Sequence, residues 1–330
     1  MKLITLFSGT GMQEEGIINT GTDYELINFC EYDPKIAKCF SLVHNEPESK
    51  NLGDITKIDM KKYYQKLIDD GNDNVDIIIS SFPCQSFSIA GKKQGFECKK
   101  NGGLFDKSFE MISLVLPKFV IFENVKNITS KKFNAVDTIT KSMTGIGYSC
   151  FHKILNSSDY GIPQNRERWF MVCVKNCEKD FVFPDKIPLT KCVEDYLSPD
   201  VERQSSPGMD MFYNEEYKKE FCSTRGLIKV FDGVQQGHFT TGFTLHRMYS
   251  IKGISPTFTT SNDTHFWEIK GKLLPEERWR LMGLKEDKLK ILKDNNIPNV
   301  LIHKICGNGI VVDVFQHLFQ KLKDTYFTDE

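Results

Sequence analysis

Short apolar runs alternate with helix-like segments over the first half of the chain. The runs are rich in strand-forming residues and end at turn residues; they cover residues 2–7, 26–31, 75–80, 119–123 and 169–174. A helical stretch follows the first run, and a second helix opens at Asp33-Pro34, because Asp can cap a helix and Pro suits its first position. This alternation predicts an α/β fold with a mostly parallel, doubly wound sheet covered on both faces.

The pattern changes after residue 179. Residues 180–270 contain several prolines and many Thr and Ser, without a long helical period. The helical pattern resumes at Pro275, and an amphipathic helix covers residues 311–322. We therefore expect a large domain made of residues 1–179 and 275–330, with a small, mostly β domain of residues 180–274 inserted into it.

Composition narrows the class of protein. With 40% hydrophobic and 26% charged residues, the chain is globular rather than disordered. It has no run of about 18 apolar residues and no signal-peptide pattern at its N-terminus, so we expect a cytoplasmic protein that does not engage a membrane. The ten cysteines follow no short-spaced framework, which predicts free thiols and no metal site.

A glycine turn, Gly9-Thr10-Gly11, follows the first run. Such a turn lets the backbone approach a ligand at a helix N-terminus, but the third glycine of a dinucleotide fingerprint is replaced by Glu14. Glu31, at the end of the second run, can accept hydrogen bonds from ribose hydroxyls, and Asp54 from an adenine amino group. These residues favour an adenosine ligand without phosphates, such as S-adenosylmethionine, over NAD; an ordinary turn with solvated acids is the alternative.

Chemically reactive side chains follow several of the predicted strands. Cys84 lies in a polar loop after the third strand, and Glu123 and Asn124 end the fourth, at the sheet edge where ligands of α/β folds bind. Arg166 and Arg168 precede the fifth strand, and their spacing predicts guanidinium groups that face the same way. A buried structural cysteine, a solvated carboxylate and a salt-bridged strand edge are the alternatives when each is taken singly.

Five motifs occur in a fixed order: Phe-Ser-Gly-Thr-Gly at 7–11, Pro-Cys-Gln at 83–85, Glu-Asn-Val at 123–125, Gln-Asn-Arg-Glu-Arg at 164–168 and Gly-Asn at 307–308. This order resembles the conserved blocks of bacterial DNA (cytosine-5)-methyltransferases, above all the small HhaI-like enzymes. The resemblance implies a Rossmann-like S-adenosylmethionine-dependent methyltransferase fold and a sequence-specific DNA cytosine-5 methyltransferase. Thr5, Met12 and Gly309 depart from the residues usual in the family.

The resemblance also implies roles for individual residues. Cys84 would add to carbon 6 of a cytosine flipped out of the duplex, and Glu123, protonated or sharing a proton at ring nitrogen 3, would stabilise the adduct while carbon 5 receives the methyl group. Arg166 and Arg168 would hold the base carbonyl and phosphates and support the cysteine loop, with Asn124 in the same catalytic set. The implied S-adenosylmethionine site consists of Phe7, Gly9, Gly11, Glu31, Tyr32, Asp54, Ile55, Pro83, Leu104, Asn308 and Ile310.

The inserted region, residues 180–274, would be the DNA target-recognition domain. A glycine- and lysine-rich loop at 86–103 would close over the phosphate backbone. The expected DNA contacts are Gln85, Ser88, Lys92, Lys93, Gln235, Gln236, Thr244 and Arg247. Solvated loop residues are the alternative reading for those in the inserted region.

The net charge of -1 by itself argues against a nucleic-acid partner, but the charge is unevenly distributed. Residues 178–224 carry six Lys or Arg against eleven Asp or Glu, whereas residues 225–274 carry six against three. This predicts a basic cleft between the two domains and an acidic outer face.

The expected partner is double-stranded DNA, and the sequence leaves open whether a cognate restriction endonuclease exists. We expect a monomeric protein encoded by a bacterium or phage. The alternatives are an RNA (tRNA) cytosine-5 methyltransferase, an inactive DNA-binding homologue, and an NAD-dependent oxidoreductase, against which Glu14 argues.

Overall fold

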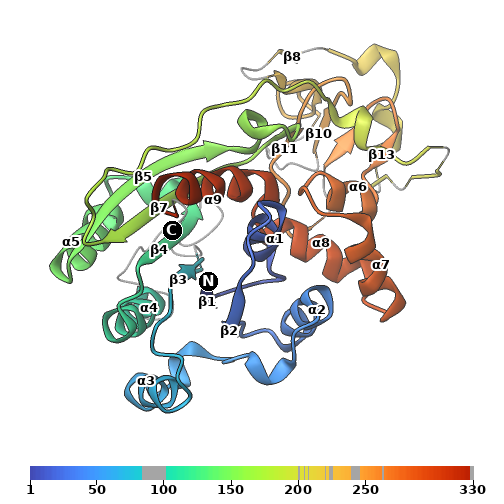
Figure 1. The fold of residues 1–330 in the computed structure, drawn as a ribbon. Helices are drawn as coiled ribbons and strands as arrows, with labels where there is room; N and C mark the ends of the chain where they lie inside the picture. Colours follow the sequence, from blue (N-terminus) through green and yellow to red (C-terminus); the bar gives the residue numbers. More distant parts are fainter. Residues whose placement is uncertain are drawn as a thin grey trace. The chain divides into compact units, whose positions relative to one another are not determined.

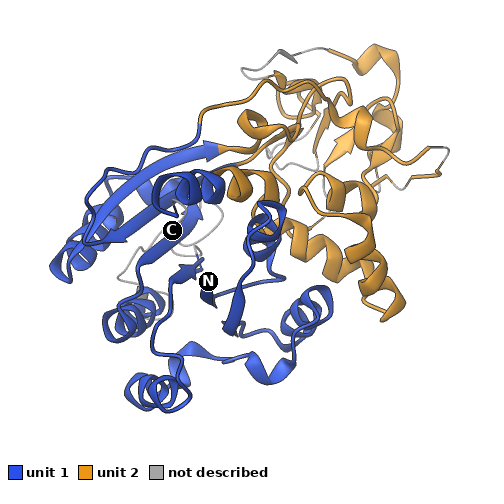
Figure 2. Ribbon diagram, in the orientation of Figure 1, with its two compact units in different colours: residues 1–155, 167–184, 318–330 blue, residues 156–166, 185–317 orange. Residues whose placement is uncertain are grey.

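The computed structural model divides the chain into two compact units. It describes residues 1–83, 102–199, 201–203, 205–206, 208–219, 221–222, 226–238, 246–261 and 264–327. Unit 1 is Met1–Leu155, Glu167–Pro184 and Leu318–Glu330, and unit 2 is Asn156–Arg166 and Asp185–His317 (Figure 2).

Unit 1 is built on a six-stranded sheet with the strand order β2-β1-β3-β4-β7-β5. Its strands are β1 (Lys2–Leu6), β2 (Glu25–Cys30), β3 (Ile77–Ser80), β4 (Phe119–Val125), β5 (Tyr148–Asn156) and β7 (Glu167–Lys175) (Figure 1). The pairs β1–β2, β1–β3 and β3–β4 are parallel, and β7 runs antiparallel to β4. All of β3 and all but the last residue of β4 are buried, so the continuous apolar runs correctly predict a sheet covered on both faces.

The helices of unit 1 follow the predicted alternation with strands. They are α1 (Met12–Asn19), α2 (Pro34–His44), α3 (Met60–Asp69), α4 (Gly102–Val115) and α5 (Ala135–Gly145), with the short 3-10 helices η1 (Glu48–Lys50), η2 (Ile55–Lys57) and η4 (Lys126–Thr129). Asp33 caps α2 as predicted, because its side chain accepts a hydrogen bond from Lys35 N at 3.0 Å.

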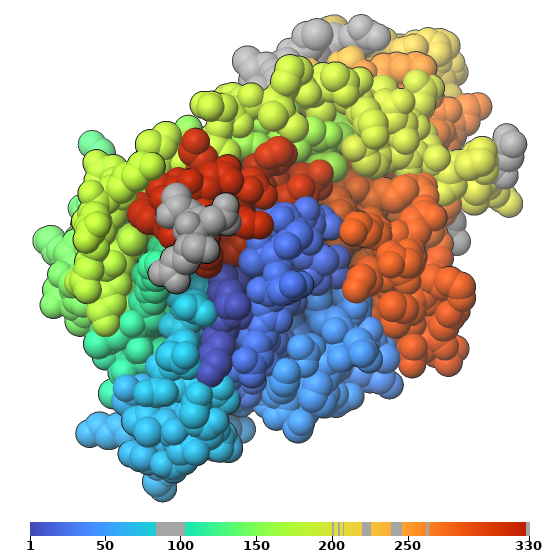
Figure 3. Space-filling view, in the orientation of Figure 1, coloured from blue at the N-terminus to red at the C-terminus, as the bar shows by residue number. Residues whose placement is uncertain are grey.

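The last helix, α9 (Val312–Tyr326), begins in unit 2 and ends in unit 1. In its final part, Lys323 Nζ donates to the Thr20 carbonyl at 3.5 Å, and Figure 3 shows red atoms of the C-terminal region beside blue atoms of the N-terminal region. The Tyr326 ring packs on Phe119 at the start of β4, with the ring centroids 5.4 Å apart. The C-terminal helix therefore helps to cover the sheet, in agreement with the amphipathic pattern at residues 311–322.

Unit 2 is irregular and contains short strands, as expected for the inserted region. A five-stranded sheet has the order β13-β12-β10-β9-β8, and β11 pairs separately with β6. The strands are β6 (Gln164–Asn165), β8 (Phe221–Cys222), β9 (Ile228–Asp232), β10 (Arg247–Tyr249), β11 (Ser255–Pro256), β12 (His265–Phe266) and β13 (Gly271–Lys272). Its helices are η5 (Ser157–Tyr160), η6 (Val193–Tyr196), η7 (Asp210–Phe212), η8 (Glu215–Tyr217), α6 (Pro275–Arg280), α7 (Glu286–Asp294) and α8 (Asn299–Asn308).

The compact units differ from the expected domain boundaries. Residues 275–317, expected in the large domain, pack with the inserted region, and so does the short segment 156–166. The cause lies in specific contacts: β6 pairs with β11, Gln164 Nε2 donates to the Leu281 carbonyl at 2.9 Å, and Arg278 NH2 donates to the Thr259 carbonyl at 2.6 Å. Packing units and functional domains need not coincide, so the recognition role of residues 180–274 stays a prediction.

Gly307 is the point where α8 meets the loop that follows β11. A Cβ atom on Gly307 would lie 2.4 Å from the Thr259 carbonyl oxygen and 2.5 Å from Thr260 N. These contacts are with backbone atoms, which cannot rotate away. The glycine of the Gly-Asn motif is therefore required by packing, whatever else it does.

We predict that Gly307→Ala lowers the free energy of unfolding by about 1–3 kcal/mol, because the added methyl group overpacks this contact. Urea denaturation of the purified variant measures the change. Gly145→Ala is the matched control: Gly145 is also a helical glycine, but no described atom lies within 4 Å of its Cβ position. An equal loss in both variants would contradict the packing explanation.

Candidate active site

The glycine turn packs against His44, another residue of unit 1. Gly11 has a φ of 79° and begins α1, and a Cβ there would lie 2.0 Å from His44 Nε2. His44 Nε2 is also 3.1 Å from the Thr10 carbonyl oxygen. Gly9 has a φ of 58°, but no described atom lies within 4 Å of its Cβ position. Gly11 is thus required by the approach of His44, whereas Gly9 faces space that a ligand can use.

Glu31 joins the glycine turn to the end of β2. Its Oε2 accepts a hydrogen bond from Gly9 N at 3.0 Å, and its Oε1 accepts one from Asp33 N at 2.9 Å. These bonds fix the Glu31 carboxylate beside the glycine turn, and its predicted bonds with ribose hydroxyls stay a prediction. Asn51, which the sequence reasoning missed, orients this region because its Oδ1 accepts bonds from Glu31 N and Gly53 N at 2.9 and 3.0 Å.

The other proposed cofactor residues of unit 1 have varied surroundings. Tyr32 is 74% exposed, whereas Ile55 is buried, and Phe7 and Leu104 are partly buried against the core of the sheet. Asp54 caps η2: its Oδ1 accepts hydrogen bonds from Thr56 Oγ1 at 2.7 Å and Thr56 N at 3.0 Å. The bond from the Thr56 hydroxyl is the main reason that the pKa of Asp54 lies below its usual value. Asp54 therefore has a structural task besides the adenine contact proposed for it.

Asn308 and Ile310 belong to unit 2. Asn308 ends α8 and is exposed, whereas Ile310 is buried. Their proposed contact with S-adenosylmethionine stays a prediction.

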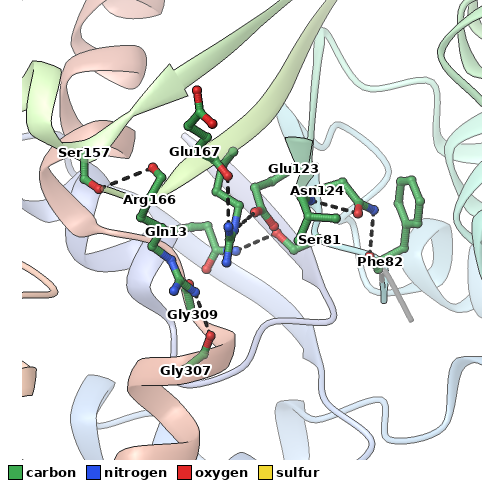
Figure 4. Close-up of polar contacts among 12 residues, drawn as sticks. Gln13, Ser81, Phe82, Glu123, Asn124, Ser157, Arg166, Glu167, Gly307 and Gly309 are labelled. Carbon is green, nitrogen blue, oxygen red and sulfur yellow. Dashed lines mark hydrogen bonds and ion pairs between the residues drawn. The ribbon is translucent and has the colours of Figure 1, made fainter. Parts of the chain in front are cut away.

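Two side chains anchor the segment that leads to Cys84. Asn124, at the end of β4, donates from Nδ2 to the Phe82 carbonyl at 3.0 Å and accepts at Oδ1 from Val125 N at 2.9 Å (Figure 4). Gln13 donates from Nε2 to Ser81 Oγ at 2.7 Å, a contact that the sequence reasoning missed. The described chain reaches Pro83, so Cys84 itself lies outside the described residues.

Glu123 and Arg168 form an ion pair beside this anchor. Arg168 Nε lies 3.3 Å from Glu123 Oε1, and the two side chains are only 13% and 11% exposed. The antiparallel pairing of β4 with β7 places Arg168 opposite Val125, so the pair crosses between neighbouring strands. The structure therefore brings together a carboxyl group, a guanidinium group and the Asn124 amide at the predicted edge of the sheet.

Arg166 and Arg168 have different partners: Arg166 bonds within unit 2 and Arg168 within unit 1. Between β6 and β7 the chain makes a tight turn, because Arg166 N donates to the Gln164 carbonyl at 3.1 Å. That the two guanidinium groups face the same way stays a prediction.

The Arg166 guanidinium group is 2% exposed and binds backbone carbonyl oxygens. NH1 donates to Phe258 O at 3.1 Å, and NH2 donates to Gly307 O at 2.7 Å and to Gly309 O (Figure 4). These bonds connect the loop after β11 with the end of α8. These bonds give Arg166 a structural task, and its predicted contact with the base carbonyl or phosphates stays a prediction.

A second buried arginine, Arg278, supports the same loop and was missed by sequence reasoning. NH2 donates to Thr259 O at 2.6 Å, and NH1 donates to Ser261 O at 3.3 Å and to His303 Nδ1 at 3.2 Å. Burial and the Arg278 charge lower the pKa of His303 to about 4, so at neutral pH its ring nitrogen can accept this bond. Its sequence signal, a charged residue inside the pattern that begins at Pro275, is too general to have identified it.

The predicted DNA contacts of unit 2 are partly engaged within the protein. Gln235 is exposed in the turn after β9, whereas Gln236 Nε2 donates to the Tyr217 carbonyl at 2.9 Å. Arg247 Nε lies 3.1 Å from Asp232 Oδ2, and Lys229 Nζ lies 2.7 Å from the same oxygen. Burial by itself raises the pKa of Asp232. The hydrogen bond from Lys229 and the other partners outweigh burial, so the pKa lies below its usual value. Two of the six basic residues of 225–274 are thus paired with Asp232, an acid already subtracted in the net charge of this region.

The remaining predicted DNA contacts lie outside the described residues. They are Gln85, Ser88, Lys92, Lys93 and Thr244. The basic cleft between domains likewise stays a prediction.

Among the described residues, no group of three or more His, Cys, Asp or Glu side chains has an arrangement that could hold a metal ion. None of the helices in the described part of the chain is long and apolar enough to cross a membrane.

Glu14, in the position of the third fingerprint glycine, is fully buried in the first turn of α1. Burial, with a contribution from the neighbouring Glu15, raises its pKa from 4.5 to about 7. At neutral pH Glu14 is therefore only partly ionised, so it would repel a pyrophosphate less strongly than an exposed carboxylate.

Comparison with known proteins gives a match along almost the whole chain. Residues 1–324 match the family model described as C-5 cytosine-specific DNA methylase. The type II methyltransferase M.HhaI of Haemophilus parahaemolyticus is 32% identical over 332 residues, which cover 96% of this chain and 93% of M.HhaI. The orphan methyltransferase M.SPRI of Bacillus phage SPR is 30% identical over 294 residues, which cover 79% of this chain but only 64% of M.SPRI.

Solved structures agree in fold. The crystal structure of the S. pombe Dnmt2 methyltransferase has a TM-score of 0.71 with 16% sequence identity, and the match covers 98% of this chain and 99% of that one. A putative DNA modification methyltransferase encoded within an E. coli prophage has a TM-score of 0.67 with 18% identity. The Rossmann-like methyltransferase fold is therefore confirmed.

We predict that Glu14→Gln flattens the pH dependence of stability. The folded state holds a proton on Glu14 that the unfolded state releases between pH 4.5 and about 7, so stability falls as the pH rises through this range. The loss is on the order of 3 kcal/mol and should be absent in the variant. Urea denaturation at about pH 5 and about pH 8 measures it.

Glu48→Gln, which changes an exposed carboxyl group, is the matched control and should keep the wild-type pH dependence. If Glu14→Gln has the wild-type slope as well, Glu14 does not carry this effect.

Proposed function

Because the chain belongs to the family of C-5 cytosine-specific DNA methylases, we propose that it methylates carbon 5 of cytosine within a specific sequence of double-stranded DNA. The methyl donor would be S-adenosylmethionine. One observation carries the proposal: the Glu123–Arg168 pair lies at the end of β4, next to the Asn124 amide that holds the segment preceding Cys84.

Cys84 is the proposed nucleophile. Its thiolate would add to carbon 6 of the target cytosine, which moves electron density from the ring double bond and makes carbon 5 nucleophilic. After methylation, a base removes the carbon 5 proton, and the electrons of that bond reform the ring double bond and expel the thiolate. The bonds from Asn124 to Phe82 and from Gln13 to Ser81 support this role, because they hold the start of the cysteine loop against the sheet.

Glu123 is the proposed acid at ring nitrogen 3. Charge develops on this nitrogen when the thiolate adds, and a proton supplied or shared by the carboxyl group would neutralise it. The contact with Arg168 Nε holds the orientation of Glu123. Arg168 is the arginine of the motif that we assign to the base carbonyl. Arg166 acts at a distance, by connecting Phe258 with the end of α8.

The residues of the glycine turn suit S-adenosylmethionine. Gly9 leaves space for a ligand, the Glu31 carboxylate is fixed beside it by the bond from Gly9 N, and the exposed Tyr32 ring lies next in sequence. Neither Lys nor Arg occurs between Phe7 and Gly11 or at residues 31, 32, 54 and 55, so these positions offer no cation for a phosphate. Bound there, S-adenosylmethionine would supply an electrophilic methyl group.

The target base must leave the helix stack before Cys84 can reach carbon 6. We assign closure over the flipped base to the loop that contains Lys92 and Lys93, and sequence recognition to residues 180–274, with Gln235 as an exposed candidate for a base contact. A monomeric state, a cytoplasmic location and a cognate restriction endonuclease stay predictions.

We predict that the protein transfers tritium-labelled methyl groups to unmethylated duplex DNA, and that Cys84→Ser lowers the rate by a thousandfold or more, on the order expected for loss of a nucleophile. DNA containing 5-fluorocytosine should trap a covalent complex, because its carbon 5 has no proton to release. Cys192→Ser, a cysteine remote in sequence from the motifs, is the control and should retain both activities.

Bisulfite sequencing of the methylated DNA then identifies the recognition sequence. Transfer to tRNA but not to DNA would support the RNA alternative. No transfer to either by a protein that binds DNA would support the inactive homologue.

We predict that Glu123→Gln lowers kcat by about 10²–10⁴, in the range expected for loss of a general acid. Combining it with Arg168→Ala should cost much less than the two single losses multiplied, because both act on one pair. Arg166→Lys should instead lower the melting temperature, since lysine cannot reproduce its fork of bonds. Independent effects of Glu123→Gln and Arg168→Ala on kcat would contradict the pairing.

A further inference from the structure

Two cysteines on neighbouring strands face each other in the sheet of unit 1. Cys150 Sγ, on β5, lies 3.4 Å from Cys173 Sγ, on β7. Both thiols are free, and neither belongs to a motif assigned to the proposed reaction. Cys173 packs in the main core of the sheet, and Cys150 lies at the margin of the same cluster.

The register of β5 and β7 makes these residues a directly opposed pair. Ser157 N donates to Arg166 O at 3.1 Å at one end, and Asn176 N donates to Gly147 O at 3.4 Å at the other. This antiparallel register places Cys150 opposite Cys173 at a position without backbone hydrogen bonds. The Cα atoms of such pairs are about 4.5 Å apart, within the range of about 4.4–6.8 Å that a disulfide can span.

The two thiols differ in accessibility and acidity. Cys150 is half-buried, whereas Cys173 is fully buried. The hydrogen bond with Cys173 lowers the pKa of Cys150, while burial raises the pKa of Cys173. An oxidant that enters from solvent therefore meets the more acidic thiol first, and the thiolate is the reactive form.

We propose that Cys150 and Cys173 are a redox modification site, which forms a reversible intramolecular disulfide when the protein encounters a peroxide. The Cys150 thiolate attacks one oxygen of hydrogen peroxide, forming a sulfenic acid and, with one proton, releasing water. The Cys173 sulfur then attacks the sulfenic sulfur, forming the S–S bond, and the hydroxyl leaves as a second water with the thiol proton. The two thiols together lose two electrons, which reduce the peroxide to two waters.

The bond would tie the edge strand to the sheet. β5 is the outermost strand and pairs with β7, which begins with Glu167 and Arg168. Cross-linking therefore restrains the strand next to the one that carries Arg168. The short Cα separation expected for this pair places the bond near the limit of unstrained geometry, which favours its reduction by thiols.

Peptide mapping of the full-length protein tests the proposal directly. After brief exposure to hydrogen peroxide and alkylation of remaining thiols, trypsin should release residues 142–153 joined to residues 169–175, each of which contains one cysteine. The pair should lose two hydrogen atoms in mass, separate on treatment with dithiothreitol, and form again in a second cycle. Hydrogen exchange of the β5 amides should be slower in the oxidised protein than in the reduced protein.

Single cysteine substitutions identify the two residues that form the disulfide. Cys150→Ser and Cys173→Ala should abolish the linked peptide, whereas Cys39→Ser, a change at another buried cysteine, should retain it. Cys84→Ser should also retain it, which separates this site from the proposed nucleophile. The proposal is overturned if wild-type protein yields the two peptides unlinked, with Cys150 alkylated or oxidised to sulfinic acid, or if Cys150 is joined to another cysteine.

Discussion

The parallel pairing of β3 with β4 determines where the candidate active site lies. Its register places Ser80 beside Phe122, so the two chains leave the sheet at the same edge. The Asn124 amide bond to the Phe82 carbonyl continues this alignment beyond the last strand residue. The reactive residues come from distant parts of the sequence, and a shared sheet edge is what makes their combination chemically useful.

Buried polar groups explain the conformation of the loop after β11 in unit 2. Arg166 and Arg278 lie in the interior of unit 2, where an unsatisfied guanidinium group would be costly, and both find backbone carbonyl oxygens in the loop after β11. These carbonyl groups lie outside the strands. The guanidinium groups therefore supply hydrogen-bond donors to the loop, and the loop carbonyls supply acceptors to the buried guanidinium groups. A residue of a family motif can therefore also hold the fold, as the bonds of Arg166 to Phe258 and Gly307 do.

Ion pairs inside the protein also change how the charges counted in the sequence should be interpreted. Lys229 and Arg247 count as positive residues in the sequence, yet both pair with the buried Asp232. Lys252 is similarly paired with Glu194 at 2.6 Å. The number of basic residues in a region thus overstates how many cations are left for a phosphate backbone. Gln235, which is exposed, is a better candidate for a base contact than Gln236, which is bonded to Tyr217.

The sequence by itself determined the alternation of strands and helices, the Asp33 cap of α2, the family and the sheet edge at which Glu123 and Asn124 lie. These features depend on local periodicity and short motifs, which neighbouring residues encode. Only the tertiary structure decided that Gly11 is required by His44, that Arg166 and Arg168 have different partners, that residues 275–317 pack with the inserted region, and that Cys150 meets Cys173. Each of these depends on contacts between residues far apart in the chain, and no local pattern records which distant partner will satisfy a buried group.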